Sequence, residues 1–189
     1  MDLRPYRLQG EKLLSPKRWE HCQAVARLAR ELAEKHGADP DKAELAGLIH
    51  DLTKEFPESR QLQMLELSGI IGEEHPLPDE CHALTGFLYA RDSLGVRDPE
   101  VLDAIRFHTA GRAGMSLVER AVFAADKFSY DRAYSDVEEY RALAFADLDE
   151  SLIAFFEYQI PKRIRQRRPL IPDCVYCYNW LLRERGGTV

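Results

Sequence analysis

The chain has 189 residues, of which 45% are hydrophobic and 31% charged, and its formal net charge at pH 7 is −6. This balance is typical of one folded domain and excludes a mainly disordered chain. No apolar run reaches the ~20 residues of a membrane helix, and the N-terminal residues lack the apolar core of an export signal. We therefore expect a single cytoplasmic domain over residues 1–189, with no membrane partner and no nucleic-acid partner.

Nine helices are predicted from apolar periodicity and from helix-capping residues. They cover 16–36, 40–55, 59–68, 79–94, 99–108, 117–129, 136–145, 148–166 and 172–185. Their starts are marked by Ser15-Pro16, Asp39-Pro40 and Asp98-Pro99, and by capping-box spacing at Ser116/Glu119 and Ser135/Glu138. Pro161 should kink or break its helix, and residues 68–78 should form a loop. The fold class predicted is an all-α helical bundle.

Four cysteines are too few for a disulfide scaffold. Cys174 and Cys177 form a C-x-x-C pair, but no second pair accompanies it. We interpret both as small buried hydrophobes on one helix face.

The sharpest local pattern is His50-Asp51 in AELAGLIHDLTKE. Ala43, Ala46 and Gly47 share a helix face with His50. Small residues there let a neighbouring helix approach and leave room for a metal ion. A structural histidine beside a surface aspartate would also explain the pair.

Two further residues suggest a site. His21 lies beside the apolar stripe of the first predicted helix, and Asp126 follows the apolar run AVFAA. A buried carboxylate needs a compensating charge, which either a metal ion or an arginine supplies. Imidazoles with carboxylates suit Fe, Mn, Co or Zn. His82 and His108 lie near helix ends, and a helix C-terminus by itself favours His108; His36 and His75 receive no site role.

In chain order, His21, His50-Asp51 and Asp126 resemble the H…HD…D signature of the HD-domain phosphohydrolases, an all-α, metal-dependent superfamily. AELAGLIHDLTKE, VLDAIRFHTAGRAGMSLVERAVFAADKF and RPLIPDCVYCYNWLL are similar to the YqeK family of symmetrical bis(5′-nucleosyl)-tetraphosphatases. The similarity runs from about Trp19 to Leu182. It implies an HD core over about 16–130, with C-terminal helices over 136–185 packing on it.

The resemblance also implies an activity: diadenosine tetraphosphate is hydrolysed to two ADP at an iron centre, with Mn or Co as substitutes. The metal ligands would be His21, His50, Asp51 and Asp126. The nucleotide and its phosphates would contact His21, Asp51, Lys54, His82, His108, Thr109, Asp126, Arg132 and Arg168. Two stretches depart from the family, because KFSYDR replaces a Tyr-Ile-Glu-Pro-Gly-Arg-like stretch and RPLIPD replaces RPIHPD.

The expected chemistry is attack of a metal-activated hydroxide on phosphorus. Asp51, Lys54 and His108 are the candidate catalytic residues: Lys54 would add positive charge, and a protonated His108 or His82 would assist the leaving phosphate. Lys54 could equally be a solvated lysine at a helix end. Residues 162–168 hold five basic side chains, which form either a solvated helix end or, with Arg168 foremost, a collar for the phosphate chain.

Two alternatives remain at this point. The chain could be an HD nucleotidase or phosphodiesterase acting on another nucleotide, or a nucleotide-binding regulatory module with little turnover. The sequence does not decide the identity of the metal, the number of ions or the base preference. It also leaves open which aromatic residue stacks on a base, and whether the protein is a homodimer or has another oligomeric state.

Overall fold

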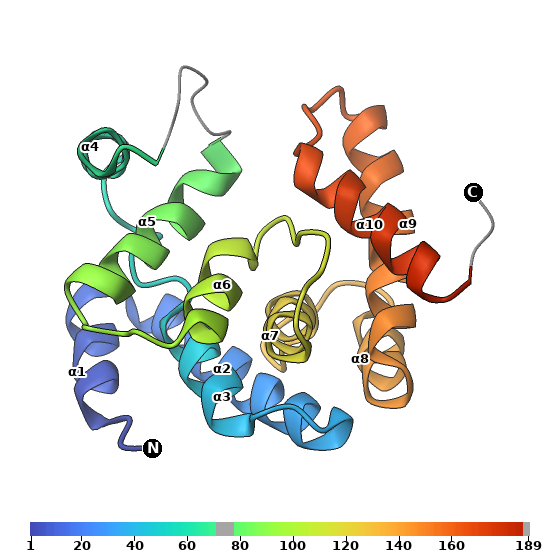
Figure 1. The fold of residues 1–189 in the computed structure, drawn as a ribbon, viewed down its shortest axis with the longest axis horizontal. Coiled ribbons are helices and arrows are strands. Elements are labelled where there is room, and N and C mark those ends of the chain that lie inside the picture. Colours follow the sequence, from blue (N-terminus) through green and yellow to red (C-terminus); the bar gives the residue numbers. More distant parts are fainter. Residues whose placement is uncertain (71–77, 187–189) are drawn as a thin grey trace.

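The computed structural model describes residues 1–70 and 78–186, with side chains left out at 78–80. These ranges contain ten α-helices and no strand, so the all-α prediction is confirmed (Figure 1). The helices are α1 (Arg4–Leu13), α2 (Pro16–His36), α3 (Pro40–Ile49), α4 (Glu58–Ser68), α5 (Pro78–Asp92), α6 (Pro99–Phe107), α7 (Leu117–Phe128), α8 (Val137–Ala146), α9 (Leu148–Arg165) and α10 (Pro172–Glu184). Most of the predicted loop over 68–78, His75 included, lies outside the described residues. None of the described helices is both long and apolar enough to cross a membrane.

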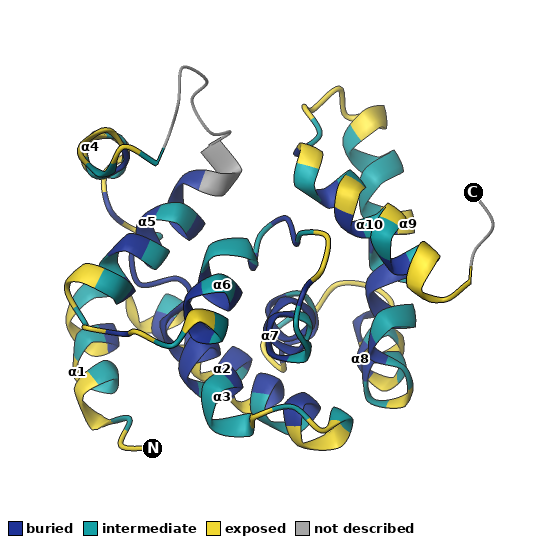
Figure 2. Ribbon diagram, viewed as in Figure 1, coloured by how far each residue is buried: buried dark blue, intermediate teal, exposed yellow. Residues whose placement is uncertain are grey.

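Helix α7 lies at the centre of the molecule and packs against α2, α3, α6, α8 and α9 (Figure 2). Nine of its twelve residues are buried, which explains why the AVFAA run is apolar all round. One hydrophobic cluster extends from Leu14 to Leu181 and includes residues of both α9 and α10. Helix α4 packs against α5 instead, through a smaller cluster that contains Leu65 and Leu88.

Helices α2 and α3 approach closely through small residues. A Cβ built on Gly47 would lie 2.9 Å from the Cα of Ala26, so any larger residue would force the two backbones apart. Ala43 and Ala46 are also fully buried on this face. The predicted small-residue face beside His50 is therefore confirmed.

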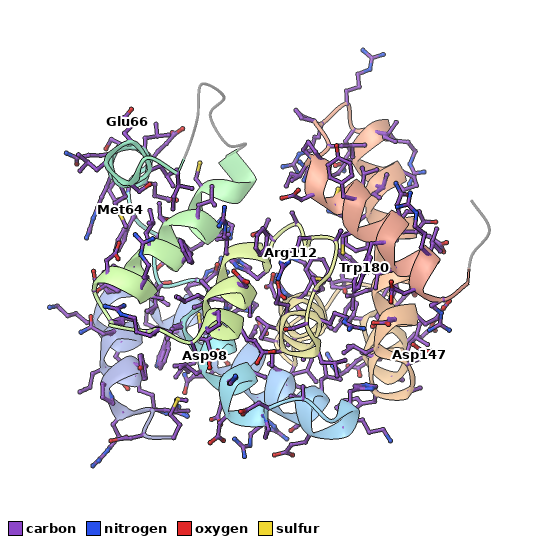
Figure 3. The ribbon with its side chains drawn as sticks, viewed as in Figure 1. Met64, Glu66, Asp98, Arg112, Asp147 and Trp180 are labelled. Carbon is purple, nitrogen blue, oxygen red and sulfur yellow. The ribbon has the colours of Figure 1, made fainter. Side chains whose placement is uncertain are left out.

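The loop between α6 and α7 is held in place by an ion pair between a half-buried arginine and a buried glutamate. The Arg112 guanidinium, near the centre of Figure 3, donates to both carboxylate oxygens of Glu119 at 2.7 and 2.9 Å. Glu119 also accepts the Ser116 backbone N–H at 2.7 Å, which completes the predicted capping box. The pair fixes the loop that carries Thr109.

Two predictions about the first half of the chain were wrong. Helix α1 was missed, because it lacks an N-cap side chain and contains Gly10. Gly10 is needed there, since a Cβ would lie 2.1 Å from the Trp19 ring. The helix predicted over 40–55 ends at Ile49, and residues 50–55 form successive turns in which Lys54 N–H donates to Asp51 O at 2.9 Å.

Two predictions about the second half also need correction. Helix α8 is capped by Asp136, whose φ is 68° and whose side chain makes no cap bond, so Ser135 and Glu138 form no capping box. Helix α9 continues through Pro161 to Arg165, so of the two predicted effects of this proline, a kink or a break, the break is wrong. Proline deprives the Glu157 carbonyl of its helical partner, but Glu157 is exposed, so water can replace that bond.

All four cysteines are buried, and none of them forms a disulfide. Cys174 is 8% exposed and Cys177 is 0% exposed, both on the inner face of α10. The interpretation of this C-x-x-C pair as small core residues is confirmed.

Candidate metal centre and its cavity

Six predicted residues converge from five parts of the fold. His21 lies on α2, His50 and Asp51 follow α3, His82 lies on α5, His108 follows α6 and Asp126 lies on α7. All six are buried, with exposed fractions between 0% and 7%.

The donors form two groups that share Asp51. One donor atom from each of His21, His50 and Asp51 lies within 4.8 Å of the others, and Asp51, His82 and His108 make a second such group. Oδ2 of Asp51 lies 3.5 Å from His50 Nε2, whereas Oδ1 lies 3.4 Å from His82 Nε2 and 3.6 Å from His108 Nε2. One carboxylate therefore faces both groups, one oxygen to each.

Three imidazoles have their tautomer set by a bond at Nδ1. The Nδ1–H of His50 donates to Gly47 O and that of His108 to Ile105 O, each at 2.7 Å. His21 Nδ1–H donates to Asp131 Oδ2 at 2.8 Å. Each Nε2 therefore carries a lone pair directed at the cluster, as a metal ligand requires.

The polar atoms at the centre lack ordinary partners. His50 Nε2 and Asp51 Oδ1 are buried and accept no hydrogen bond from any residue that the structure describes. Unpaired buried acceptors are unfavourable, and converging lone pairs repel one another. A bound cation would satisfy both atoms, so the donor set fits a metal ion.

Asp51 and Asp126 are ionised, whereas the imidazoles of His82 and His108 are neutral. Burial opposes ionisation of Asp51, but the histidines around it hold its pKa well below the usual range. Burial likewise opposes ionisation of Asp126, but the charge of the neighbouring Lys127 keeps the pKa of this carboxyl well below its usual range. Burial lowers the pKa of His82 to about 2 and also lowers the pKa of His108.

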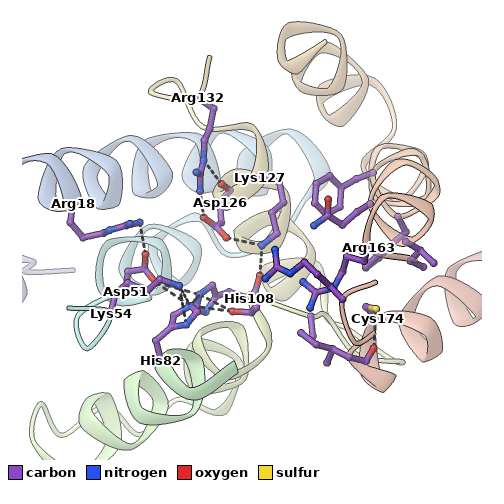
Figure 4. A pocket seen from close by; sticks show the side chains of 18 residues that line it. Arg18, Asp51, Lys54, His82, His108, Asp126, Lys127, Arg132, Arg163 and Cys174 are labelled. Carbon is purple, nitrogen blue, oxygen red and sulfur yellow. Dashed lines mark hydrogen bonds and ion pairs between the residues drawn. The ribbon is translucent and has the colours of Figure 1, made fainter. Parts of the chain in front are cut away.

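The cluster opens into a cavity of about 370 Å³ (Figure 4). The wall of this cavity beside the cluster, the near wall, is lined by cationic side chains. Arg18 contacts Asp51 Oδ2 at 3.0 Å. Lys127 and Arg132 contact Asp126 at 2.8 and 3.0 Å. The sequence left open whether a metal ion or an arginine compensates the charge of this carboxylate, and the structure places both Arg132 and the histidines next to it.

Lys54 completes this wall. Its Nζ lies 3.0 Å from both ring nitrogens of His82, and burial lowers its pKa. It is therefore not the fully solvated lysine that the sequence left open.

The far wall comes from α9, α10 and the loop between them. Arg163 and Arg168 of the basic run line it, together with apolar residues. Arg163 donates to the Pro169 carbonyl at 2.8 Å, which anchors this side chain at the turn into α10. Ile171, one of the departures from the family pattern, also lies on this wall.

Every predicted site residue lies in the cluster or on the cavity wall. These residues are His21, His50, Asp51, Lys54, His82, His108, Thr109, Asp126, Arg132 and Arg168. The Thr109 hydroxyl lies 3.2 Å from His82 Nε2. His36, given no site role, instead bonds to the Ala144 carbonyl at 2.7 Å.

Sequence reasoning missed Arg18, Lys127 and Asp131. Lys127 and Asp131 belong to the segment DKFSYDR that begins at Asp126, so their nearness in sequence to a candidate ligand was the signal for them. Arg18 precedes His21 by three positions on one helix, a spacing that places both on one face.

A profile described as HD domain matches residues 18–131. The chain belongs to the HD-domain family. A Bacillus subtilis relative named as a symmetrical bis(5′-nucleosyl)-tetraphosphatase is 36% identical over 171 residues, covering 89% of this chain and 91% of that protein. Relatives of the same name from Halalkalibacterium halodurans and Staphylococcus aureus are 36% and 34% identical, and each match covers more than nine-tenths of both proteins.

A solved structure supports the same assignment for the HD-domain fold. The crystal structure of a predicted HD superfamily hydrolase involved in NAD metabolism from Clostridium acetobutylicum matches with a TM-score of 0.89 and 28% identity, covering 97% of this chain and 98% of that one. The resemblance of the chain to the YqeK family is thus confirmed, as is the HD-domain fold class.

Proposed function

We propose that this HD-domain protein hydrolyses diadenosine tetraphosphate symmetrically to two ADP. The observation that carries the proposal is the pair of metal-capable donor groups sharing Asp51, which open into a cavity whose near wall carries four cationic side chains. These cations are Arg18, Lys54, Lys127 and Arg132. The relatives named for this activity, similar over nearly the whole chain, support it.

His21, His50, Asp51 and Asp126 would hold one metal ion, and Asp51, His82 and His108 a second. We propose iron, with manganese or cobalt as substitutes, because neutral imidazoles and carboxylates without a thiolate suit these ions. When bound, such an ion supplies hydroxide near neutral pH and positive charge against a phosphate.

The side chains around this centre would bind and orient the phosphate chain. Symmetrical cleavage breaks the anhydride between the second and third phosphates, so each side of the broken bond carries a nucleoside diphosphate. Lys54, Lys127 and Arg132 would bind the nucleoside diphosphate that lies beside the metal donors. Arg168, across the cavity, would bind the phosphates of the other nucleoside diphosphate. The Thr109 hydroxyl would donate to a phosphate oxygen.

The catalytic roles follow from the protonation states. Asp51 is ionised and spans both donor groups, so it would position whatever binds there. The lowered pKa of His108 leaves its Nε2 unprotonated at neutral pH, which favours a ligand role over that of a general acid. Lys54 would then stabilise the leaving ADP, a good anionic leaving group, by its charge.

We also propose that the helices form one domain, since a single hydrophobic cluster joins α2 to α10. Four buried thiols that form no disulfide favour a reducing compartment, and we propose the cytoplasm.

The direct test is to incubate the purified protein with diadenosine tetraphosphate and Fe, Mn or Co under reducing conditions and to resolve the products. ADP alone is expected. AMP with ATP would overturn symmetrical cleavage. Absence of product from metal-loaded protein would overturn the substrate and favour another nucleotide or a binding module.

A further inference from the structure

The two walls of the cavity differ in chemistry. The near wall carries the metal donors and four cations, whereas the far wall, around Arg163 and Cys174 in Figure 4, has apolar side chains beside its two arginines. Phe155, Phe156 and Ile160 of α9 line this far wall. The cavity thus offers cationic side chains for phosphates and, on its far wall, apolar side chains for a base, as a nucleotide requires.

Phe155 is held rigidly. Its ring packs edge-on against Phe123 and Phe128, with ring centroids 6.0 and 5.8 Å apart. The Phe155 side chain is only partly buried, and the rest of it borders the cavity. Because the Phe155 side chain is already ordered, stacking of a base on its ring would cost little side-chain conformational entropy.

Gln159 lies one helical turn after Phe155 and lines the same cavity. It is partly buried, yet its amide makes no hydrogen bond to any residue in the described part of the chain. A side-chain amide carries a donor and an acceptor side by side. The amide is therefore available to a ligand.

We propose that Phe155 and Gln159 form the base subsite and that Gln159 makes the protein prefer adenine over guanine; this inference rests on the proposed function. A glutamine amide pairs with adenine through two bonds, donating to N7 and accepting from the N6 amino group. Guanine offers the acceptors N7 and O6 on that edge, so the Gln159 carbonyl oxygen would face another acceptor. Stacking on Phe155 holds either purine.

The test compares kcat/KM for diadenosine and diguanosine tetraphosphate in the wild type, Gln159→Ala and Phe155→Leu. Gln159→Ala should lower the value for the adenine substrate about tenfold and change the guanine value less than threefold. Phe155→Leu should lower both alike. Gln63→Ala, an exposed glutamine on α4 outside the cavity, is the matched control and should change neither.

Equilibrium binding of ADP and GDP to the metal-loaded protein separates this inference from the proposed function. If the wild type forms no ADP from diadenosine tetraphosphate, the proposed function fails, while the ADP/GDP affinity ratio still tests the subsite. Equal wild-type affinities, or equal losses for both nucleotides in Gln159→Ala, would overturn the assignment of Gln159. An unchanged melting temperature for Gln159→Ala is expected, because its amide has no hydrogen-bond partner to lose among the described residues.

Discussion

His21 Nδ1 lies 2.8 Å from a carboxylate oxygen of Asp131, a residue 110 positions later in the chain. The other two fixed tautomers, at His50 and His108, use a backbone carbonyl three residues earlier on their own helices. His21 alone among these three depends on a side chain from a distant segment. That segment, at the end of α7, also carries Arg132, which contacts Asp126 at 3.0 Å.

We therefore expect Asp131→Ala to weaken metal binding about 10- to 100-fold, the usual effect of losing the carboxylate partner of a ligating histidine. Asp131→Asn should lose less if its amide oxygen still accepts the Nδ1–H. A metal titration of the metal-free protein measures both. Asp92→Asn, which disturbs only an exposed pair with Arg91, is the control, and equal affinities in all four proteins would contradict the role.

The shared carboxylate predicts a particular pattern of metal loss. Asp51→Ala should reduce metal content at both donor groups, whereas His21→Ala and His108→Ala should each affect one. Metal-to-protein ratios measured by elemental analysis report this directly. His36→Ala, whose ring bonds to a backbone carbonyl away from the cluster, should keep the wild-type ratio. If Asp51→Ala lost no more metal than His21→Ala, the conclusion that Asp51 serves both donor groups would be wrong.

Asp98 links stability to pH at a point remote from the site. Its carboxylate caps α6 by accepting from Glu100 N at 3.0 Å and contacts Lys42 at 2.9 Å. Burial opposes ionisation, but Lys42 and the cap bonds lower the pKa of Asp98 below 3.8. A lowered folded-state pKa stabilises the protein above the unfolded value and ceases to do so as the pH falls through the folded one.

Asp98→Ala should accordingly lower the free energy of unfolding by about 1 kcal/mol at pH 7, the typical contribution of an N-cap. Urea denaturation at a series of pH values should show the difference from wild type narrowing below about pH 4, where the carboxyl becomes protonated. A difference that stayed constant into acid would mean that the ionised form contributes nothing.

Gly47→Ala tests the close approach of α2 and α3. The added Cβ would lie 2.9 Å from the Ala26 backbone, so the helices must separate, at a cost of about 1–3 kcal/mol. Thermal unfolding should show a lower melting temperature. Metal affinity should fall as well, since Gly47 O holds His50 through Nδ1. A melting temperature at or above that of the wild type would show that the interface has room to relax.

Much of the helical framework could be predicted because its signals are local. The caps at Ser15, Asp39, Asp98 and Ser116 each bond to an N–H two or three residues ahead. Where the decisive contact is remote, prediction failed: Gly10 in α1 is explained by the Trp19 ring of the next helix. The end of α3 at Ile49 was missed for a different reason, since no glycine or proline marks it.

The same division applies to the site. The order of His21, His50-Asp51 and Asp126 along the chain resembles the HD signature, and this resemblance was enough to predict that the four side chains come together. Only the tertiary structure decided three other relationships. They are the pairing of His21 with Asp131, the division of Asp51 between two donor groups and the position of Gln159 opposite the cations. Those relationships join residues from separate helices, and the packing of α7 against its neighbours, rather than any local pattern, sets the distances between them.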